Sequence, residues 1–219
     1  INLKDKNIKK IDDKPLLAYS IEFAKELKCV DRIFCSTDSQ KYADIAIKYG
    51  AEAPFLRSVE SSRSNSMEDD VLKDLREKFK LYNIEEPDLI VWLRPTFIFR
   101  SIEDVTKCID LLKTDQTLTA SRTVIQTENR LYRIDNNLLL SNFIDKGKSM
   151  IRRQDIEESF KVYSTDVFRF KNNNFNDSFL GDKISPVITN KICGLDIDDE
   201  FDFNLVKCIV ENDLLKSLT

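Results

Sequence analysis

Acidic and apolar residues alternate in one short segment near the end of the 219-residue sequence, Leu195-Asp196-Ile197-Asp198. On an extended chain successive side chains point to opposite faces, so Asp196 and Asp198 would share one face. Two carboxylates on one face, completed by substrate phosphates and water, are typical of a magnesium site. The same segment also fits a strand end before an acidic helix N-terminus at 199–202, where negative charge complements the helix dipole. The pattern alone leaves both interpretations open.

The sequence contains no histidine, which restricts the chemistry further. A metal site must then use carboxylates or cysteines, and a general base must be Asp, Glu, Lys, Tyr or Cys. The five cysteines are odd in number and show no CxxC spacing, which argues against zinc and is typical of reduced thiols in a cytosolic protein. We therefore expect Mg²⁺ as the cofactor and a cytoplasmic location.

Charge and hydropathy argue against two classes of partner. The net charge is only −4 and the basic residues are scattered, so the sequence predicts no nucleic-acid surface. No apolar run approaches the roughly 18 residues that a membrane span requires, and the start does not resemble a signal peptide, so no membrane contact is expected. Because the first residue is Ile1 rather than Met, we expect the sequence to begin partway into the natural protein.

Apolar spacing predicts helices that alternate with short strands. A helix at 40–49 ends at Gly50, which suits a C-terminal cap, and the apolar run 88–93 between two prolines is the strongest buried-strand candidate. Such alternation predicts an α/β, Rossmann-like, mainly parallel sheet flanked by helices, with ligands at the carboxyl ends of the strands. Further helices are expected at 15–27, 67–82, 101–112 and 203–218, and further strands at 32–37, 53–57 and 118–121.

The alternation weakens between residues 126 and 176, a polar stretch of short strand-like pieces and asparagine clusters. We interpret 126–176 as an inserted antiparallel arm, and 1–125 with 177–219 as the α/β domain. The arm has too little apolar pattern to form a domain alone, so we expect it to mediate a homodimer.

Six short motifs stand in a fixed order along the chain: Lys6-Asn7-Ile8-Lys9 with 13–21, Ser36-Thr37-Asp38, 49–57, 93–100, Arg152-Arg153-Gln154-Asp155 and Asp196-Ile197-Asp198. Together they resemble the CMP-sialic acid synthetase family, the cytidylyltransferases that activate sialic acid and related nine-carbon keto sugars. Each motif is weak alone, but the resemblance spans nearly the whole chain.

The resemblance implies attack of the anomeric hydroxyl of an acidic keto sugar on the α-phosphate of CTP, with release of pyrophosphate. Asp196 and Asp198 would then hold Mg²⁺ and carry catalysis, since positioning and charge neutralisation dominate phosphoryl transfer. Lys6 and Asn7 match the start of the nucleotide site, although they also fit a solvated terminal segment. Arg57 and Ser66 match the cytidine side, although Arg57 also fits an ordinary surface position.

The acceptor side of the resemblance involves the residues after the predicted strand 88–93 and the arm. It implies substrate binding by Arg94, Thr96 and Arg100, although Arg100 could also pair with Glu103 or Asp104. Arg152 and Arg153, in the arm of a neighbouring subunit, would help to bind the sugar carboxylate, for which a guanidinium is well shaped, and Gln154 would also bind the substrate. Surface charge is the alternative for the arm arginines.

Some residues depart from the family pattern. A glycine-rich basic phosphate loop is expected immediately before Lys6 and is missing from these residues, either by truncation or because the protein is a degenerate relative. Arg94 replaces a glutamine, the bulky segment 97–99 replaces "SPL", and 163–167 replaces "NGAIY". These changes favour a different nine-carbon acceptor, of legionaminic or pseudaminic type, over an eight-carbon one.

Two other hypotheses remain at this point. One is a non-catalytic relative that uses its sheet and arm for dimerisation or ligand binding. The other is a nucleotidyltransferase that keeps the fold but uses another nucleotide or sugar.

Overall fold

The computed structural model describes residues 3–63, 65–128, 131–136, 138–142, 158–162, 164–175 and 178–215. Its helices follow the apolar spacing of the sequence, except that the last one begins at residue 200 and ends at 211 where 203–218 was expected. The five α-helices are α1 (Leu16–Glu26), α2 (Gln40–Tyr49), α3 (Glu68–Leu81), α4 (Ile102–Thr114) and α5 (Glu200–Glu211). The short 3₁₀ helices are η1 (Lys6–Ile8), η2 (Glu60–Ser62) and η4 (Lys191–Gly194).

The central sheet has the strand order β3-β8-β4-β7, and β9 also pairs with β4. The α/β class is confirmed, and β3, β4 and β9 run in one direction. β8 lies between β3 and β4 and runs opposite to both, because it returns from the arm into which β4 leads. The strands are β3 (Leu89–Leu93), β4 (Ala120–Thr127), β7 (Ser159–Lys161), β8 (Thr165–Arg169) and β9 (Ile184–Ile188).

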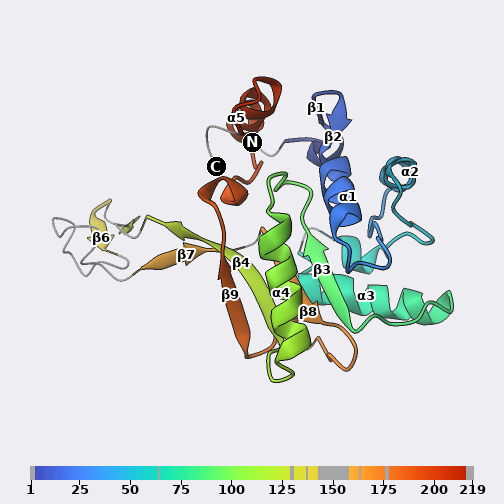
Figure 1. The fold of residues 1–219 in the computed structure, drawn as a ribbon. Helices are drawn as coiled ribbons and strands as arrows, with labels where there is room; N and C mark the ends of the chain where they lie inside the picture. The colour runs from blue at the N-terminus through green and yellow to red at the C-terminus, as the bar shows by residue number, and fades with distance from the viewer. Residues whose placement is uncertain are drawn as a thin grey trace.

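Helices cover both faces of this sheet (Figure 1). On one face, Phe168 of β8 packs with Leu72 and Phe79 of α3 in a cluster rich in aromatic rings. On the other face, Val167, the adjacent residue of β8, packs with Val105 of α4. The alternation of β8 side chains thus places α3 and α4 on opposite sides, as expected for a layered α/β domain.

The edge of the sheet at β3 differs from the sequence-based expectation. All five residues of β3 are only half-buried, although the continuous apolar run predicted a fully buried strand. Among the described residues β3 pairs only with β8, so its other edge is open. The segment expected as a strand at 32–37 forms an isolated parallel bridge between Phe34 and Glu52. An apolar strand with one unpaired edge keeps part of its side-chain surface exposed.

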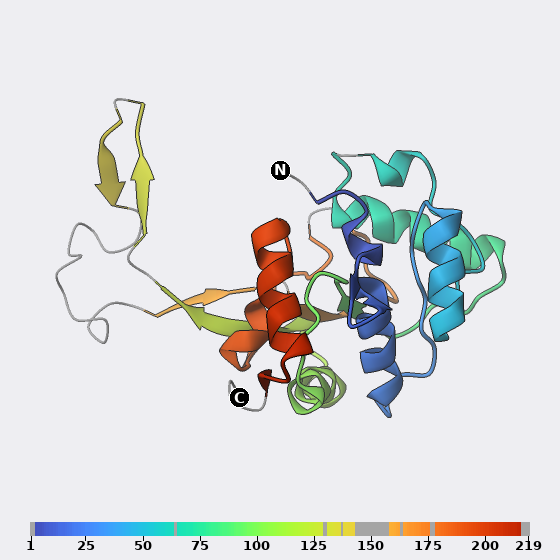
Figure 2. The ribbon, with the colours of Figure 1, turned by 90° about the horizontal axis from the view of Figure 1, so that it is seen from above.

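The arm stands well clear of the body in both ribbon views (Figures 1 and 2). Its described part consists of the outer end of β4, which pairs with β7 at 125–127, and a hairpin of β5 (Tyr132–Ile134) and β6 (Leu140–Asn142). β8 belongs to the central sheet, so the expected arm boundary at 176 was too late. β8 carries two charged residues, Asp166 and Arg169, and asparagines follow it in the sequence, so its composition is similar to that of a polar insertion.

The amino-terminal region adds a two-stranded hairpin of β1 (Lys10–Ile11) and β2 (Lys14–Pro15) before α1. Ile11 and Leu16 are fully buried there and pack against Val206 and Ile209 of α5. This contact brings the first and last helices of the described chain together. No helix in the described ranges is both long and apolar enough to cross a membrane.

Candidate active site

Lys6 connects the start of the chain to the acidic segment near its end. The Nζ of Lys6, in η1, donates hydrogen bonds to the carbonyl of Ile197 at 2.9 Å and to Oδ1 of Asp198 at 3.1 Å. The Asp198 side chain is 72% exposed, whereas that of Lys6 is 26% exposed. Asn7 lies beside Lys6 in η1 and is half-buried. The first and last of the six motifs therefore meet at one place.

The structure confirms the helix-cap interpretation for the later part of the acidic segment. Asp199 is the N-cap of α5, and its carboxylate accepts from the amides of Phe201 and Asp202, while Asp202 bonds back to the amide of Asp199. This capping box gives Asp199 and Asp202 a structural role. Asp196 and Asp198 precede the cap, in an irregular rather than strand conformation.

Asp196 carries an unusual feature for a carboxylate. Its Oδ1 is buried and has no hydrogen-bond partner among the described residues. The next residue, Ile197, is fully buried, and its amide donates to the carbonyl of Thr96 at 3.2 Å. Since a buried unpartnered carboxylate oxygen is costly, the geometry favours a ligand at Asp196.

This donor set fits Mg²⁺ that is also coordinated by substrate. Within the described ranges, no cluster of three or more Asp, Glu, Cys or His residues could hold a metal without help. Mg²⁺ usually takes only one or two carboxylates and completes its shell with phosphate oxygens and water. The oxygens of Asp196 and Asp198 are of the kind that Mg²⁺ needs, and the basic Lys6, which contacts Asp198, suits an anionic ligand.

Arg94 and Thr96 lie in the turn that follows β3, close to the acidic segment. The Arg94 guanidinium donates to Oδ2 of Asp166 at 2.7 Å and reaches Oε1 of Glu68, the first residue of α3, at 3.4 Å. Thr96 is largely buried and contacts the acidic segment through its carbonyl. The turn after β3 thus joins the start of α3 to the segment that carries Asp196 and Asp198.

Two charged residues of this region were missed by sequence reasoning. Asp166 in β8 is fully buried, and its second oxygen accepts from Nε of Arg122 in β4 at 2.8 Å. Both residues lie inside strands, where an isolated charge is easily read as solvent-facing. The available signal was an aspartate directly before the apolar pair Val167 and Phe168, since a charge inside an apolar strand needs a buried partner.

Arg100 lies beneath this turn and is held by protein atoms. It donates to the carbonyl of Arg94 at 2.6 Å and to the hydroxyls of Thr165 and Ser20 at 3.3 and 3.2 Å. Desolvation lowers the pKa of Arg100 to about 9, and the nearby charge of Arg94 contributes in the same direction. These contacts replace the expected alternative partners, Glu103 and Asp104. They place Arg100 as a support of the turn, and its direct contact with substrate stays a prediction.

Arg57 brings two further motifs together. Its amide donates to the carbonyl of Thr37 at 2.8 Å, and its guanidinium lies 4.0 Å from Asp38. The Nε of Arg57 is buried and has no hydrogen-bond partner in the part of the chain that the structure describes. Such a donor is suited to an acceptor group on a ligand.

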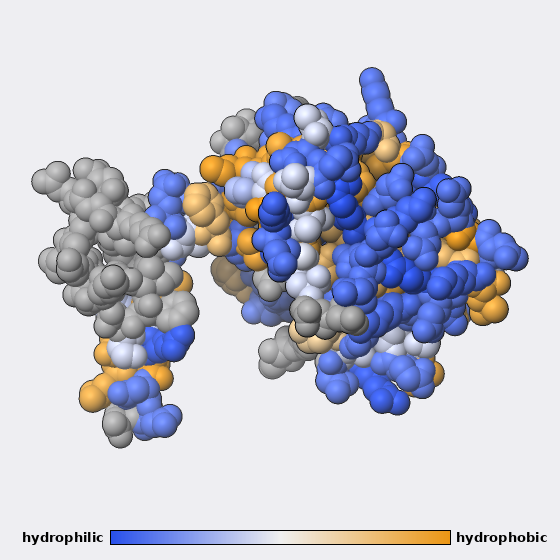
Figure 3. Space-filling view, turned by 90° about the horizontal axis from the view of Figure 1, so that it is seen from below, coloured by the Kyte–Doolittle hydropathy of each residue, from blue (hydrophilic) through white to orange (hydrophobic). Residues whose placement is uncertain are grey.

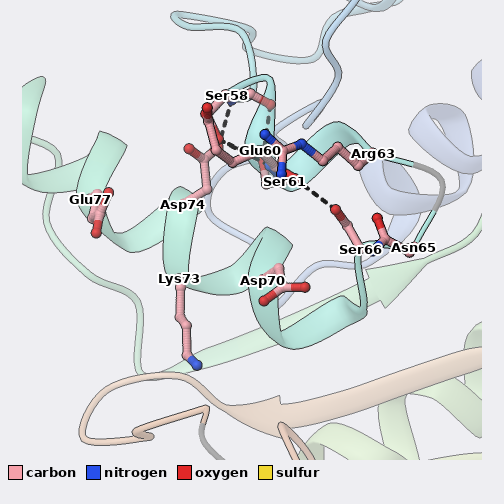
Figure 4. Close-up of a pocket in the computed structure, with 10 residues that line it drawn as sticks. All are labelled: Ser58, Glu60, Ser61, Arg63, Asn65, Ser66, Asp70, Lys73, Asp74 and Glu77. Carbon is pink, nitrogen blue, oxygen red and sulfur yellow. Dashed lines mark hydrogen bonds between the residues drawn. The ribbon is translucent and has the colours of Figure 1, made fainter.

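Ser66 closes the loop that follows Arg57. Its hydroxyl donates to the carbonyl of Glu60 at 2.8 Å. A polar cavity of about 340 Å³ opens between this loop and α3 (Figure 4), where Asp74 accepts from the amide of Ser58. The residues around it carry both charge signs and come from the loop and α3: Ser58, Glu60, Ser61, Arg63, Asn65, Ser66, Asp70, Lys73, Asp74 and Glu77.

The arm contributes one residue that the sequence did not single out. Lys161 in β7 donates from Nζ to the carbonyl of Gly194 at 3.1 Å, and the same atom lies 5.8 Å from the centre of the Phe97 ring. It therefore lies between the turn after β3 and the segment that leads to Asp196. Arg152 and Gln154, which were predicted to bind the acceptor, lie outside the described residues.

Comparisons with known proteins agree on one family. A family model described as cytidylyltransferase matches residues 2–196. The chain is 26% identical to the post-translational flagellin modification protein B of Campylobacter coli, over 98% of this chain and 92% of the relative. It is also 26% identical to the CMP-N,N'-diacetyllegionaminic acid synthase of Legionella pneumophila, over 95% of this chain and 90% of the relative.

A solved structure supports the same fold. It is titled as CMP:2-keto-3-deoxy-manno-octonic acid synthetase complexed with CTP and matches with a TM-score of 0.66, covering 97% of this chain and 94% of that one. The sequence identity is 14%, so this likeness concerns the fold alone.

Proposed function

The chain belongs to the cytidylyltransferase family, and on this premise we propose that it transfers CMP from CTP to the anomeric hydroxyl of a sialic acid-like nonulosonic acid, releasing pyrophosphate. The observation that carries this proposal is the meeting of Lys6 with the Ile197 carbonyl and Asp198, in the same short segment as Asp196, whose Oδ1 is buried and unpartnered among the described residues. A cation and two carboxylates at one place suit a triphosphate with its metal.

The protein's own groups account for positioning and charge neutralisation. Lys6 would contact the phosphates, and because its pair with Asp198 is partly exposed, it can exchange that partner for an anion at small cost. Arg57, with its buried unpartnered Nε, would bind an acceptor atom on the cytidine side, and Ser66 and Asn7 would complete the nucleotide contacts. In-line transfer then depends mainly on holding the acceptor hydroxyl and the α-phosphate in register.

Asp196 and Asp198 would hold Mg²⁺. When bound, Mg²⁺ neutralises phosphate charge and lowers the pKa of a coordinated hydroxyl. Asp196 would contribute its buried oxygen and Asp198 its exposed carboxylate. Lys6 is bonded to Asp198 and to the carbonyl of Ile197, which lies between the two acids in the sequence.

The acceptor we propose is an acidic nonulosonic acid of the legionaminic or pseudaminic type. The relative from Legionella pneumophila is named for a legionaminic acid product. Arg94 lies in the turn after β3, where its guanidinium is suited to a carboxylate, and Arg152 and Gln154 of the arm remain proposed contacts. The five cysteines are free, which agrees with the cytoplasmic location that we propose.

We further propose that the arm forms a homodimer. The hairpin exposes a group of large apolar side chains that a monomer would leave in water, and apolar residues are visible on it in Figure 3. The most exposed are Leu138 at 85%, Leu140 at 72% and Ile134 at 70%. Light scattering should give a dimer for the wild type and a monomer for Leu138→Asp with Leu140→Asp. A wild-type monomer would contradict this.

The experiment for the main proposal is an assay of pyrophosphate release with full-length protein. Each of the four nucleoside triphosphates is combined with a panel of keto acids that includes legionaminic, pseudaminic, sialic and eight-carbon acids. We expect release with CTP and a nine-carbon acid, dependent on Mg²⁺. Release only with another nucleotide, or no release with any acid, would reject the proposal.

A further inference from the structure

Asp166 is a fully buried carboxylate whose two oxygens are both bound by arginines. Arg94 approaches Oδ2 at 2.7 Å from the turn after β3, and Arg122 approaches Oδ1 at 2.8 Å from the neighbouring strand β4. Asp166 stands directly opposite Arg122 in the β4–β8 pairing and opposite Trp92 in the β3–β8 pairing. The carboxylate therefore lies in the middle of three strands, with one arginine on each side.

The position of Arg94 is fixed at more than one point. Besides Asp166, its guanidinium reaches Glu68, and its carbonyl accepts bonds from Arg100 at 2.6 Å and from the amide of Phe97 at 3.2 Å. Its side chain nevertheless keeps 17% exposure, compared with 0% for that of Asp166. Arg94 thus combines a fixed geometry with access to the surface of the site.

Stability alone gives a poor explanation for this cluster. A buried ion pair loses much of its attraction to desolvation, and well-packed apolar residues often replace one without loss of stability. The rest of β8 shows that apolar packing is available here, since Val167 and Phe168 are fully buried. A role in recognition explains the cluster better, because a prearranged guanidinium binds a carboxylate with little reorganisation.

Resting on the proposed function, we propose that Asp166 is a positioning residue for acceptor binding, which, with Arg122 on its other oxygen, holds the Arg94 guanidinium in the orientation that binds the carboxylate of the keto acid. Arg94 touches the acceptor, whereas Asp166 and Arg122 act through it. The predicted signature is a change in acceptor affinity without an equal change in CTP affinity.

The test compares steady-state constants for CTP and for the preferred keto acid in the wild type and in Asp166→Asn. Losing the charged hydrogen bond should raise the acceptor KM by about 10-fold to 100-fold, while the CTP KM stays within about 2-fold. Glu86→Gln is the control, since it too removes a carboxylate charge from an arginine, in this case a partly buried carboxylate that pairs with Arg76 away from the turn. It should leave both KM values unchanged.

A second variant keeps the proposal testable if Asp166→Asn does not fold. Arg94→Gln leaves Asp166 paired with Arg122 and should raise the acceptor KM alone. Where both variants fold, the double variant should add less than about 2-fold to the effect of Arg94→Gln, because Asp166 acts through Arg94. Arg94→Lys should recover part of the lost affinity.

The outcomes separate this inference from the proposed function. A wild type without turnover on CTP and any nonulosonic acid would reject both. Turnover in the wild type, with an acceptor KM unchanged in Arg94→Gln, would reject the inference alone. Equal increases in the KM for CTP and for the acceptor, or additive effects in the double variant, would also reject it.

Discussion

The site contains two groups of charges that differ in their surroundings. Lys6 and Asp198 form a pair at the surface, with the Asp198 side chain 72% exposed. Arg94, Asp166 and Arg122 form a cluster inside the sheet, where the Asp166 side chain is fully buried. The surface pair can be rearranged at small cost, because exposed ion pairs contribute only about 0–1 kcal/mol. The buried cluster is fixed, because separating it would leave desolvated charge unpaired.

This difference matches the two tasks of a cytidylyltransferase. Metal and triphosphate must enter and pyrophosphate must leave in each cycle, which suits groups that exchange partners readily. The acceptor must be held in one orientation for in-line attack, which suits groups that do not move. We therefore propose that the surface pair serves the metal and phosphates and that the buried cluster serves the acceptor.

The largest expected effect concerns the stability of the buried cluster. Asp166→Asn should lower the free energy of unfolding by about 3–5 kcal/mol, because two arginines lose their shared buried partner. Urea denaturation followed by circular dichroism measures this. A loss below about 1 kcal/mol would show that the cluster is not held more firmly than the surface pair.

Asp198→Asn should instead reduce turnover and leave the stability of the protein nearly unchanged. We expect Mg²⁺-dependent turnover to fall by about 100-fold to 1000-fold, because an amide is a weaker Mg²⁺ ligand than a carboxylate, while the melting temperature changes little. Asp199→Asn is the adjacent control and should keep full activity, since Asn caps a helix as well as Asp does. Unchanged turnover in Asp198→Asn would remove the metal assignment.

Both residues of the surface pair were predicted from the sequence, whereas only Arg94 of the buried cluster was. Periodicity and the Gly50 cap located α1, α2 and α4, and the order of motifs pointed to Lys6, Asp196 and Asp198, of which Lys6 and Asp198 are in contact. Asp166 and Arg122 were not predicted as site residues, because only the pairing of β4 with β8 shows that they face each other. The run 88–93 was wrongly expected to be fully buried, because composition says which side chains are apolar but not whether a neighbouring strand is present.

A smaller effect is expected for the cation of the surface pair. Lys6→Met should raise the KM for CTP by about 10-fold, because one phosphate contact is lost, and should leave the acceptor KM unchanged. Lys4→Met removes an exposed charge nearby and serves as the control. An increase in the acceptor KM instead would indicate that Lys6 serves acceptor binding and would contradict its proposed contact with the phosphates.

The smallest expected effect is the pH dependence of stability that arises from the buried thiol of Cys108. Burial raises the pKa of Cys108 from 9.0 to about 11, and the nearby Ser121 side chain acts in the opposite direction. The folded thiol thus keeps its proton where the unfolded chain has lost it. Its contribution to stability is therefore complete below pH 9 and is lost as the pH rises through about 11.

The matching variant is Cys108→Ser, which removes the ionisable thiol with little change in shape. At pH 10 the wild type should have lost about 1 kcal/mol more of its pH 8 stability than the variant has. Urea denaturation at the two pH values measures this. Identical pH dependence in both proteins would contradict the assigned burial effect.

The central claim is that the surface pair binds metal and phosphates and that the buried cluster orients the acceptor. Its most direct test is a Mg²⁺ titration of the wild type, Asp198→Asn and Asp166→Asn, with CTP and acceptor each varied in turn. Our account predicts that Asp198→Asn loses the Mg²⁺ response while its remaining activity keeps the wild-type acceptor KM. It predicts that Asp166→Asn keeps the wild-type Mg²⁺ response and has a raised acceptor KM. A wild-type Mg²⁺ response in Asp198→Asn, or a shift of the same constant in both variants, would contradict it.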